Sequence, residues 1–298
     1  MSKRIEFAEY GGPEVLRWAE DLLAEPGHGQ IRVRNELIGV NPIDWKMTAG
    51  HFGDTLTLPG VPGWASTGTV DAVGEGVNDF SVGDAVIAGA RGGSYRELLI
   101  IDARLVAHRP PTVSTEQAAG LPSSGVAGYS LIHHLGITDA DTLLVHGAAG
   151  SVGSAAVQIA IARGARVIGT ASPENHDYLR SIGAIPIYYK NGLVEAVKAT
   201  GIITASADAV GGQRSVQAAA ELLPSPSRAV TAWGDEFSYA AGIPWVEHPA
   251  DELERTVELA ATGELIVRIA QTLPLVEAAT AFTLSMTAHA PGKILLRV

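Results

Sequence analysis

Three glycines, Gly147, Gly150 and Gly153, stand at three-residue spacing directly after a short apolar run, Leu143–Val145. Such a run is typical of a buried parallel strand. A glycine turn between a strand and a helix lets the backbone approach an anionic group, and the amides that open the helix can hold it. The spacing favours the pyrophosphate of a dinucleotide, although the first glycine of the usual G-x-G-x-x-G pattern falls on Ala148.

Each glycine of this loop is expected to do a separate task. Gly147 would supply the tight turn, Gly150 would let the phosphates come close, and Gly153 would let the helix pack on the strand. The free N–H groups of Ser151 and Val152 would then face the ligand at the positive end of the helix. The alternative is an ordinary β-α-β crossover whose glycines serve packing alone.

The end of the second strand predicts which nicotinamide dinucleotide binds. An NAD-specific site presents a carboxylate to the ribose 2′-hydroxyl about twenty residues beyond the glycines. Here the segment is Ile168-Gly-Thr-Ala-Ser172, and Thr170 and Ser172 offer hydroxyl groups instead. Such an end accepts a 2′-phosphate, which favours NADPH. Glu174 leaves NADH open as an alternative, because it could bind the ribose diol if it turned inward.

Composition limits the kinds of protein that this chain can be. With 298 residues, 46% hydrophobic and 18% charged, it is long enough for two domains with their own cores. The net charge of −11 argues against nucleic acid or an anionic membrane surface as a partner. No uncharged apolar run reaches the roughly eighteen residues of a membrane span, and the first ten residues lack the apolar core of a secretory signal. We therefore expect a cytoplasmic protein.

Cysteine is absent from the chain. This excludes disulfides, thiolate nucleophiles, iron–sulfur clusters and thiolate zinc sites. The nine histidines are scattered, and the adjacent pair His133 and His134 would not share a helix face. We expect no metal site.

The pattern of elements predicts an α/β protein with two domains. Residues 1–112 are rich in short β segments and glycine turns and are expected to form a compact β-barrel-like domain. A helix capped by Ser114 follows, and strands and helices then alternate up to residue 249, which predicts a doubly wound parallel sheet. Residues 250–298 are expected to return to the first domain. The expected strands are 30–37, 66–73, 85–87, 95–101, 143–146, 167–170, 185–188, 205–210, 229–233, 243–246 as a possible sixth strand of the parallel sheet, and 293–298; late helices are expected at 251–262 and 275–287.

Several short motifs follow one another in a fixed order along the chain. They are Tyr10-Gly-Gly-Pro-Glu-Val-Leu16, Gly39-Val-Asn-Pro-Ile-Asp-Trp-Lys46, Pro62-Gly63, Val73-Gly-Glu-Gly-Val77, Val82-Gly-Asp84, Leu121-Pro-Ser-Ser-Gly125, the glycine turn and Pro291-Gly-Lys-Ile-Leu295. With these motifs the whole chain resembles the zinc-independent branch of the medium-chain dehydrogenase/reductase superfamily, the quinone oxidoreductase and enoyl reductase-like group. The resemblance implies a GroES-like catalytic domain, residues 1–112 and 250–298, and a Rossmann NADPH-binding domain, residues 113–249.

The zinc-dependent branch of the same superfamily has metal ligands at positions that can be compared. Asn41 stands in place of its first cysteine, Gly63-Trp64-Ala65 in place of its Gly-His-Glu segment, and Ser123 in place of its later cysteine. Without a metal to polarise a simple carbonyl, an acceptor with its own electron sink is expected. Ala65 also replaces the acid that the zinc-independent branch usually carries after Pro-Gly, so the role of that acid is open here.

The resemblance places hydride transfer in the cleft between the two domains. Asn41 is the candidate catalytic residue. Either Asn41 or a hydroxyl group would polarise the acceptor oxygen while solvent delivers the proton; with Pro42, Asn41 could instead only form a turn. Asp44 is expected to cap a helix that starts near Trp45 rather than to donate a proton. Tyr95 is expected in the barrel core, with general acid as the alternative. The proposed apolar substrate wall, whose members could also be ordinary core, is Trp45, Phe52 and Trp233.

The resemblance also implies a set of contacts to the cofactor. Ser172, His176 and Tyr189 would hold its phosphate, although Tyr188 and Tyr189 could equally pack in the core. The remaining expected cofactor contacts are Asn41, Ser124, Gly150, Ser151, Val152, Val210 and Lys293.

Three functions remain open at this point. The first is reduction of a quinone or an α,β-unsaturated carbonyl by NADPH; the second is reduction of a carrier-bound enoyl thioester in a biosynthetic pathway. The third is a non-catalytic NADPH-binding role, which the fold alone does not exclude. The resemblance further implies a homodimer that forms through the outer edge of the Rossmann sheet, near residues 237–246.

Overall fold

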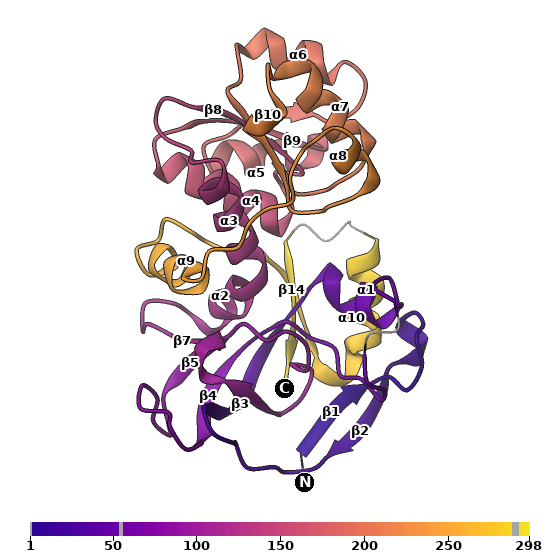
Figure 1. The fold of residues 1–298 in the computed structure, drawn as a ribbon, viewed down its shortest axis with the longest axis vertical. Helices are drawn as coiled ribbons and strands as arrows, with labels where there is room; N and C mark the ends of the chain where they lie inside the picture. The colour runs from indigo at the N-terminus through magenta and orange to yellow at the C-terminus, as the bar shows by residue number, and fades with distance from the viewer. Residues whose placement is uncertain (1, 54–55, 288–291) are drawn as a thin grey trace. The chain divides into compact units, whose positions relative to one another are not determined.

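The computed structural model describes residues 2–53, 56–287 and 292–298, so Pro291 of the last motif lies outside the described residues. The chain divides into two compact units, unit 1 with residues 1–123 and 268–298 and unit 2 with residues 124–267 (Figure 1). The two ends of the sequence therefore build one unit, and the middle builds the other.

These boundaries differ from the expected ones at 112 and 249 because of two helices. Helix α2 (Thr115–Gly120), capped by Ser114, packs on strands β3 (Gln30–Val40) and β4 (Ala65–Val73) of unit 1. Its small buried residues let it come close, and a Cβ added at Gly39 would lie 2.4 Å from the carbonyl oxygen of Ala119. Helix α9 (Glu252–Ala261) packs instead on α3 (Val126–His134) of unit 2.

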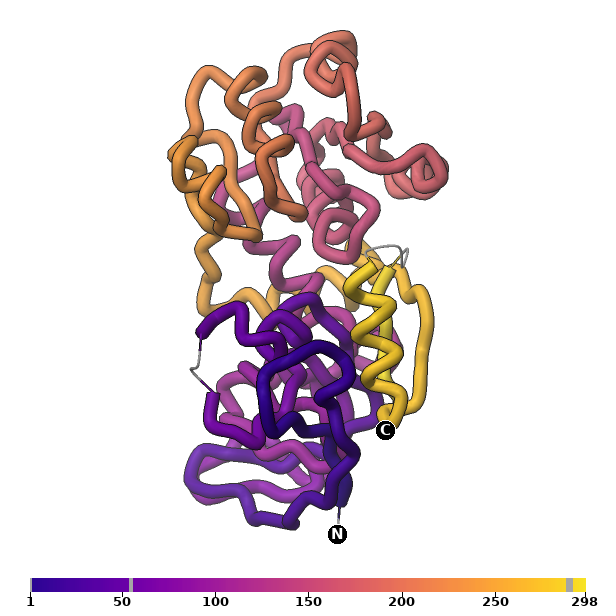
Figure 2. The backbone as a smooth tube through the Cα atoms, turned by 90° about the vertical axis from the view of Figure 1, so that its right-hand side faces the viewer, coloured from indigo at the N-terminus to yellow at the C-terminus, as the bar shows by residue number. Residues whose placement is uncertain are grey.

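Unit 1 is built on a seven-stranded sheet in the part of the chain that the structure describes. The order is β13-β14-β3-β4-β5-β7, and β6 pairs with β3. Strand β14 lies antiparallel to β3, so a strand from the end of the chain completes a sheet that begins near the start (Figure 2). The other elements of the unit are β1 (Ser2–Glu6) and β2 (Arg17–Asp21), which pair with each other, β5 (Ala85–Ala88), β6 (Leu98–Asp102), β7 (Val106–His108), β13 (Ile269–Pro274), β14 (Lys293–Arg297), α1 (Pro42–Thr48) and α10 (Ala278–Met286).

Strand β3 supplies side chains to two hydrophobic clusters of unit 1. Its first half sends Ile31 and Val33 into a cluster with β4, β5 and β6, and its second half sends Ile38 and Val40 into a cluster with β14 and α10. The second cluster also buries the ring of Tyr95, so the end of β3 is packed in the core just before α1 begins.

Unit 2 is a parallel sheet in the order β10-β9-β8-β11-β12 with helices connecting the strands. The chain moves from β8 to β9 on one side and later returns to β11 on the other, so the carboxyl ends of β8 and β11 form a topological switch point, where α/β proteins bind ligands. The elements are β8 (Thr142–His146), β9 (Arg166–Ala171), β10 (Ile185–Tyr188), β11 (Ala205–Asp208), β12 (Ala229–Thr231), α3, α4 (Ser151–Ala162), α5 (His176–Ser181), α6 (Leu193–Thr200), α7 (Gln213–Leu222), α8 (Glu236–Ala240) and α9.

The possible sixth strand at 243–246 is wrong. In the described residues this segment makes only an isolated bridge between Thr231 and Trp245. Pro244 has no N–H group to donate, and β12 is three residues long, so a longer ladder does not form.

Candidate functional site

The glycine loop of unit 2 has the geometry of a phosphate-binding turn. Gly147 adopts φ +68°, which favours glycine, and its N–H donates to Thr170 Oγ1 at 3.1 Å. The N–H of Ala148 donates to the carbonyl of Thr170 at 3.0 Å. These two bonds fasten the turn to β9, and helix α4 begins directly behind it with Gly150 as its N-cap.

The spaces around the glycines support two of the three expected tasks. A Cβ on Gly153 would lie 2.2 Å from the carbonyl oxygen of Gly147, so only glycine lets the helix pack on the turn. A Cβ on Gly150 would have only that same oxygen near it, at 3.3 Å, and the site is otherwise open. The N–H groups of Ser151 and Val152 have no acceptor among the described residues. A pyrophosphate of a nicotinamide dinucleotide fits this arrangement.

The end of β9 carries polar groups. Ser172 Oγ accepts from Asn175 Nδ2 at 3.2 Å, and a ring nitrogen of His176 lies 3.3 Å from the carbonyl oxygen of Ala171. Glu174 is exposed in the short 3₁₀ turn Pro173–Asn175. The strand end therefore offers hydroxyl, amide and imidazole groups at the position where an NAD-specific site places a carboxylate.

Lys190 was missed by the sequence analysis. Its Nζ lies 5.7 Å from the ring centre of Tyr188 and 6.0 Å from that of Tyr189, and hydrogen bonding to Tyr188 raises its pKa. Tyr188 is 38% exposed, and Tyr189 is half-buried, so this pair is not a core pair. Arg214 of α7 is near enough for its charge to act on Lys190. The sequence did hold a signal for Lys190, because this lysine closely follows β10. Strands β10 and β9 are parallel neighbours, so their carboxyl ends lie at the same edge of the sheet.

Asp208, at the end of β11, holds the loop that follows it. Its buried carboxylate accepts from the N–H of Val210 at 2.9 Å, the N–H of Gly211 at 3.0 Å and Ser215 Oγ at 2.8 Å. The side chain of Val210 lies against the glycine turn, because a Cβ added at Gly147 would be 2.1 Å from Val210 Cγ2. Asp208 thus determines where the candidate cofactor residue Val210 lies.

Two aromatic or titratable side chains border this loop. Trp233, half-buried after β12, lies so close that a Cβ on Gly211 would be 2.4 Å from its ring. His146 is buried beside Asp208 on the neighbouring strand, and its Nε2 has no hydrogen-bond partner among the described residues. Burial lowers the pKa of His146 while the charge of Asp208 opposes that change, so His146 is neutral at pH 7.

In unit 1, four polar side chains form a buried cluster at the start of α1. Lys293 Nζ donates to Asn41 Oδ1, and Asn41 Nδ2 donates to the carbonyl of Gly39 at 2.9 Å. Asp44 Oδ2 accepts from the N–H of Asn41 at 2.8 Å and from the hydroxyl of Tyr95 at 3.1 Å. This cluster brings together two expected site residues, Asn41 and Lys293.

The expected helix start at Trp45 is wrong by one turn. Helix α1 begins at Pro42 with Asn41 as its N-cap, and Asp44 in the first turn binds back to the N–H of Asn41. Proline is favoured at the first helical position because its φ is fixed and it has no N–H to satisfy. Tyr95 is fully buried, as expected, and its hydroxyl contacts Asp44.

The other expected site residues lie apart from these clusters. Trp45 is half-buried on α1, packs against the core of unit 1 and donates from Nε1 to Ser285 Oγ at 3.3 Å. Phe52 is 45% exposed after α1 and is not a core residue. Ser124 is buried in the π-helical turn Leu121–Gly125, at the start of unit 2.

The described residues contain no group of three or more His, Cys, Asp or Glu side chains that could hold a metal ion. At the compared positions, Ala65 is buried at the start of β4, and Trp64 donates from Nε1 to Met47 Sδ at 3.2 Å. Neither the methyl group of Ala65 nor the indole of Trp64 is a zinc ligand.

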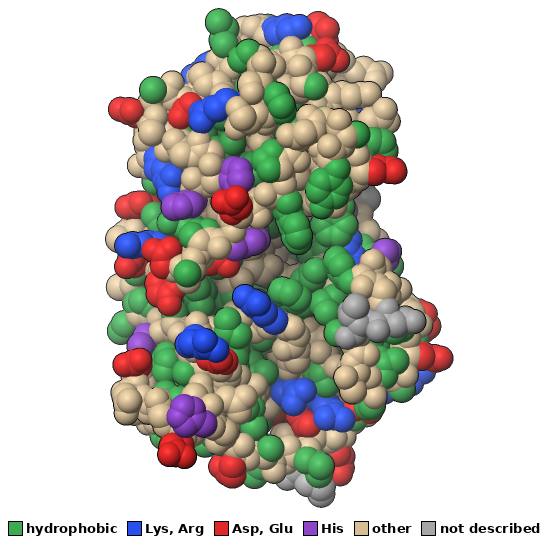
Figure 3. Space-filling model, in the orientation of Figure 1, with side chains coloured by type: hydrophobic (Ala, Val, Ile, Leu, Met, Phe, Trp, Pro, Cys, Tyr) green, Lys and Arg blue, Asp and Glu red, His purple; other side chains and the backbone are tan. Residues whose placement is uncertain are grey.

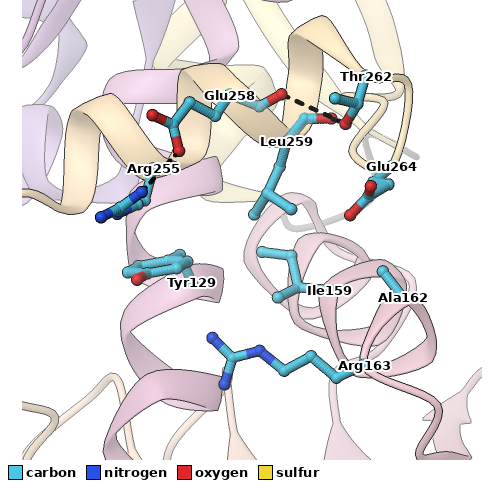
Figure 4. A pocket seen from close by; sticks show the side chains of 9 residues that line it. All are labelled: Tyr129, Ile159, Ala162, Arg163, Arg255, Glu258, Leu259, Thr262 and Glu264. Carbon is cyan, nitrogen blue, oxygen red and sulfur yellow. Dashed lines mark hydrogen bonds and ion pairs between the residues drawn. The ribbon is translucent and has the colours of Figure 1, made fainter.

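A separate cavity of about 350 Å³ lies between α3, α4 and α9 of unit 2 (Figure 4). Its walls include Tyr129, with Arg163 5.9 Å from the ring centre, and the ion pair of Arg255 with Glu258. None of the expected site residues lines it.

On the face in Figure 3, acidic and basic side chains are intermixed rather than gathered by sign. No helix within the described residues is long and apolar enough to cross a membrane.

Comparisons with known proteins agree with this geometry. The family model of the alcohol dehydrogenase GroES-like domain matches residues 27–111, and the zinc-binding dehydrogenase model matches residues 189–296. A quinone oxidoreductase from Pseudomonas aeruginosa is 42% identical over 191 residues, which cover 62% of this chain and 57% of that protein. The chain spans about three fifths of the length of the curated quinone oxidoreductases that it matches. The polyketide synthase GfsB of Streptomyces halstedii is 35% identical over 251 residues, 81% of this chain and 4% of the synthase.

Solved structures extend the similarity to the whole chain. The quinone oxidoreductase of Coxiella burnetii superposes with a TM-score of 0.89 at 27% identity, over 100% of this chain and 99% of that one. A mycobacterial protein solved as a complex with NADPH gives a TM-score of 0.87 at 28% identity, over 100% of both chains. The expected GroES-like and Rossmann domains are confirmed. The chain belongs to the medium-chain dehydrogenase/reductase superfamily, in its quinone oxidoreductase-like group.

Proposed function

We propose that the protein is an NADPH-dependent reductase of quinones or α,β-unsaturated carbonyls. The observation that carries the proposal is the glycine loop of unit 2, with its unpartnered amides and an adjacent strand end that has hydroxyl groups in place of a carboxylate. The similarity to proteins named quinone oxidoreductases supports the acceptor class.

When bound, NADPH would supply a hydride to the acceptor. The amides of Ser151 and Val152 would hold its pyrophosphate, and Ser172 with Lys190 would hold its 2′-phosphate. The mycobacterial neighbour solved with NADPH supports this choice over NADH. The further proposed contacts, to be tested one by one, are Asn41, Ser124, Gly150, His176, Tyr189, Val210 and Lys293.

Most residues of the proposed acceptor side lie in unit 1, and Trp233 lies in unit 2. Asn41 is proposed to polarise the acceptor oxygen: its Nδ2 carries two hydrogens, and one of them is bound to the carbonyl of Gly39. Trp45, Phe52 and Trp233 are proposed to give the acceptor an apolar surface. A quinone or enone suits such a site, because the conjugated acceptor takes up the negative charge without a metal ion.

A second candidate is reduction of an enoyl thioester, supported by the similarity to a polyketide synthase. The two activities, and a non-catalytic NADPH-binding role, differ in the acceptor that is turned over. We would follow the NADPH absorbance band with an ortho-quinone, a simple enone and an enoyl thioester offered in turn. Oxidation with the first two supports the proposal, and oxidation with the thioester alone supports the second candidate. Tight NADPH binding without oxidation by any acceptor refutes both.

The cofactor site is tested separately by binding. Lys190→Met should weaken NADPH binding by roughly 10- to 100-fold, since a charge-assisted bond to phosphate contributes about 1.5–3 kcal/mol, and should leave NADH binding unchanged. Lys198→Met on α6 is the matched control. Equal losses for both cofactors would remove Lys190 from the 2′-phosphate site. Gly150→Asp should abolish NADPH binding while the chain stays folded, because it places a carboxylate where the phosphates would lie.

A homodimer and a cytoplasmic location also belong to the proposal. The segment after β12 exposes three aromatic side chains, Phe237 at 38%, Tyr239 at 62% and Trp245 at 57%, beside a sheet edge with a single bridge. A second copy placed there would cover them. Sedimentation of the wild type and of Tyr239→Glu should show a dimer that the substitution weakens; a wild-type monomer would refute it.

A further inference from the structure

The buried cluster of unit 1 contains a cation that the proposed function so far uses only as a cofactor contact. Lys293 is 2% exposed, and its Nζ donates to Asn41 Oδ1. Asp44 is 1% exposed, and its Oδ1 has no hydrogen-bond partner among the described residues. Two groups that can each carry a charge are therefore enclosed together, which is costly unless they neutralise one another or serve a reaction.

A glycine on the neighbouring strand leaves space for the side chain of Lys293. Lys293 is the first residue of β14, which pairs with the end of β3. A Cβ added at Gly39 would lie 2.9 Å from Lys293 Cε, so the glycine leaves the space through which the side chain reaches Asn41. The position of the ammonium is therefore fixed by the backbone of two strands.

Lys293 contacts the residue that stands where the zinc-dependent branch has its first cysteine. A metal ion in that branch stabilises the negative charge that develops on the substrate oxygen. We propose that the Lys293 ammonium does this at the acceptor oxygen and then gives it a proton, with Asp44 as the positioning residue that fixes Asn41, the hydrogen-bond acceptor of Lys293. The proposal rests on the proposed reductase function and replaces cofactor binding as the main role of Lys293.

The protonation states agree with this geometry. Burial raises the pKa of Asp44 to about 7, although hydrogen bonds from Asn41 and the charge of Lys293 act to lower it. Burial lowers the pKa of Lys293 to about 8, against the charge of Asp44. Tyr95 faces Asp44 with a hydroxyl whose pKa burial raises well above 10, and it stays protonated. Lys46 lies on the same helix, and α10, which packs on that helix, has no charged residue within its bounds.

The chemical step balances with one hydride and one proton. The acceptor takes a hydride, its π electron pair moves onto oxygen, and an oxyanion forms. An N–H bond of Lys293 then breaks as an O–H bond forms, which leaves the lysine as a neutral amine. Water then gives a proton to the neutral amine, which restores the ammonium of Lys293, leaves hydroxide in the solvent and closes the cycle.

Four variants test the proposal: Lys293→Met, Lys293→Arg, Asp44→Asn and, as a matched control, Lys3→Met of β1 in the same unit. With an ortho-quinone, Lys293→Met should lower kcat by about 100- to 1000-fold, the usual contribution of a general acid. Its Kd for NADPH should rise by less than tenfold, or about 1.4 kcal/mol, so the loss of kcat should exceed any loss of cofactor binding. Lys293→Arg should restore part of kcat, because it keeps the cation. Wild-type kcat should fall as pH rises above about 8, where Lys293 loses its proton.

A Lys293→Met protein that binds NADPH more than tenfold more weakly with an unchanged kcat would overturn the proposal, because Lys293 would then be a cofactor contact.

Carbon NMR of the Asp44 carboxyl without cofactor gives an answer even if no acceptor is reduced and the proposed function fails. The carboxyl should titrate near neutral pH in the wild type and at a higher pH in Lys293→Met. Titration in the ordinary carboxyl range, or no change with the variant, refutes the pairing. If Lys293→Met does not fold, the Asp44→Asn protein should still show the fall in kcat, and full activity there overturns the role of Asp44.

Discussion

Asp208 gives the sharpest test of how unit 2 holds its cofactor loop. Its carboxylate accepts three hydrogen bonds of 3.0 Å or less, from the N–H groups of Val210 and Gly211 and from Ser215 Oγ. Asp208→Ala leaves the N–H groups of Val210 and Gly211 without this acceptor, while Ser215 Oγ keeps the carbonyl of Gly212. Each donor left unsatisfied in a buried place costs about 1–3 kcal/mol. Asp208→Asn keeps one oxygen for the two amides, while the hydroxyl of Ser215 can turn to accept, so we expect a cost of about 1 kcal/mol.

Urea unfolding followed by circular dichroism measures this difference in the free energy of unfolding. Asp177→Ala is the control, since its carboxylate is exposed and, among the described residues, pairs only with Arg180, and we expect a change within about 0.5 kcal/mol. The Kd for NADPH should rise at least tenfold in Asp208→Ala, because Val210 is no longer held against the glycine turn, and by much less in Asp208→Asn. Equal costs for the two substitutions, or a cost of Asp208→Ala below about 1 kcal/mol, would refute this account.

Three further predictions concern the loop, the cofactor and pH. Gly153→Ala should weaken NADPH binding far more than Gly150→Ala, since only its Cβ meets backbone atoms below 3 Å; equal Kd values would contradict this. Ser172→Asp should shift preference from NADPH toward NADH, measured as the ratio of the two Kd values, and an unchanged ratio would show that Ser172 does not face the 2′-phosphate. Burial raises the pKa of Asp44 from 3.8 to about 7, so the wild type should lose a few kcal/mol of stability as pH rises from 4 to 7; Asp44→Asn should not, and parallel unfolding curves would refute the shift.

The sequence predicted unit 2 well because buried parallel strands and glycine turns leave local signals. The apolar run before Gly147 became β8, and Gly153 is required by a contact within its own loop. The possible sixth strand failed because Pro244 cannot donate a ladder hydrogen bond. Local sequence patterns therefore predict those elements that depend on backbone chemistry within a short segment.

Contacts between distant residues were beyond such patterns. Lys190 lies near Tyr188 and Tyr189 by local sequence, but its place beside the end of β9 depends on the strand order. The hydrogen bond between Lys293 and Asn41 joins residues 252 positions apart. Lys293 and Asn41 were predicted as site residues only through the family resemblance. Asp44 was predicted only as a helix cap, because its contact with Tyr95 forms only in the tertiary fold.

The origin of β14 in residues 293–297 affects the order in which this protein can fold on the ribosome. Strand β3 cannot pair with β14 until all of unit 2 has been synthesised. Until then the Lys293 cation is also missing from the Asp44 cluster. Unit 2, continuous in sequence, can fold during synthesis, whereas unit 1 must close through contacts of long sequence separation, which form slowly. The cation of the proposed reaction is thus made after all of unit 2, so a nascent chain gains its complete Asp44 cluster only once Lys293 has been added.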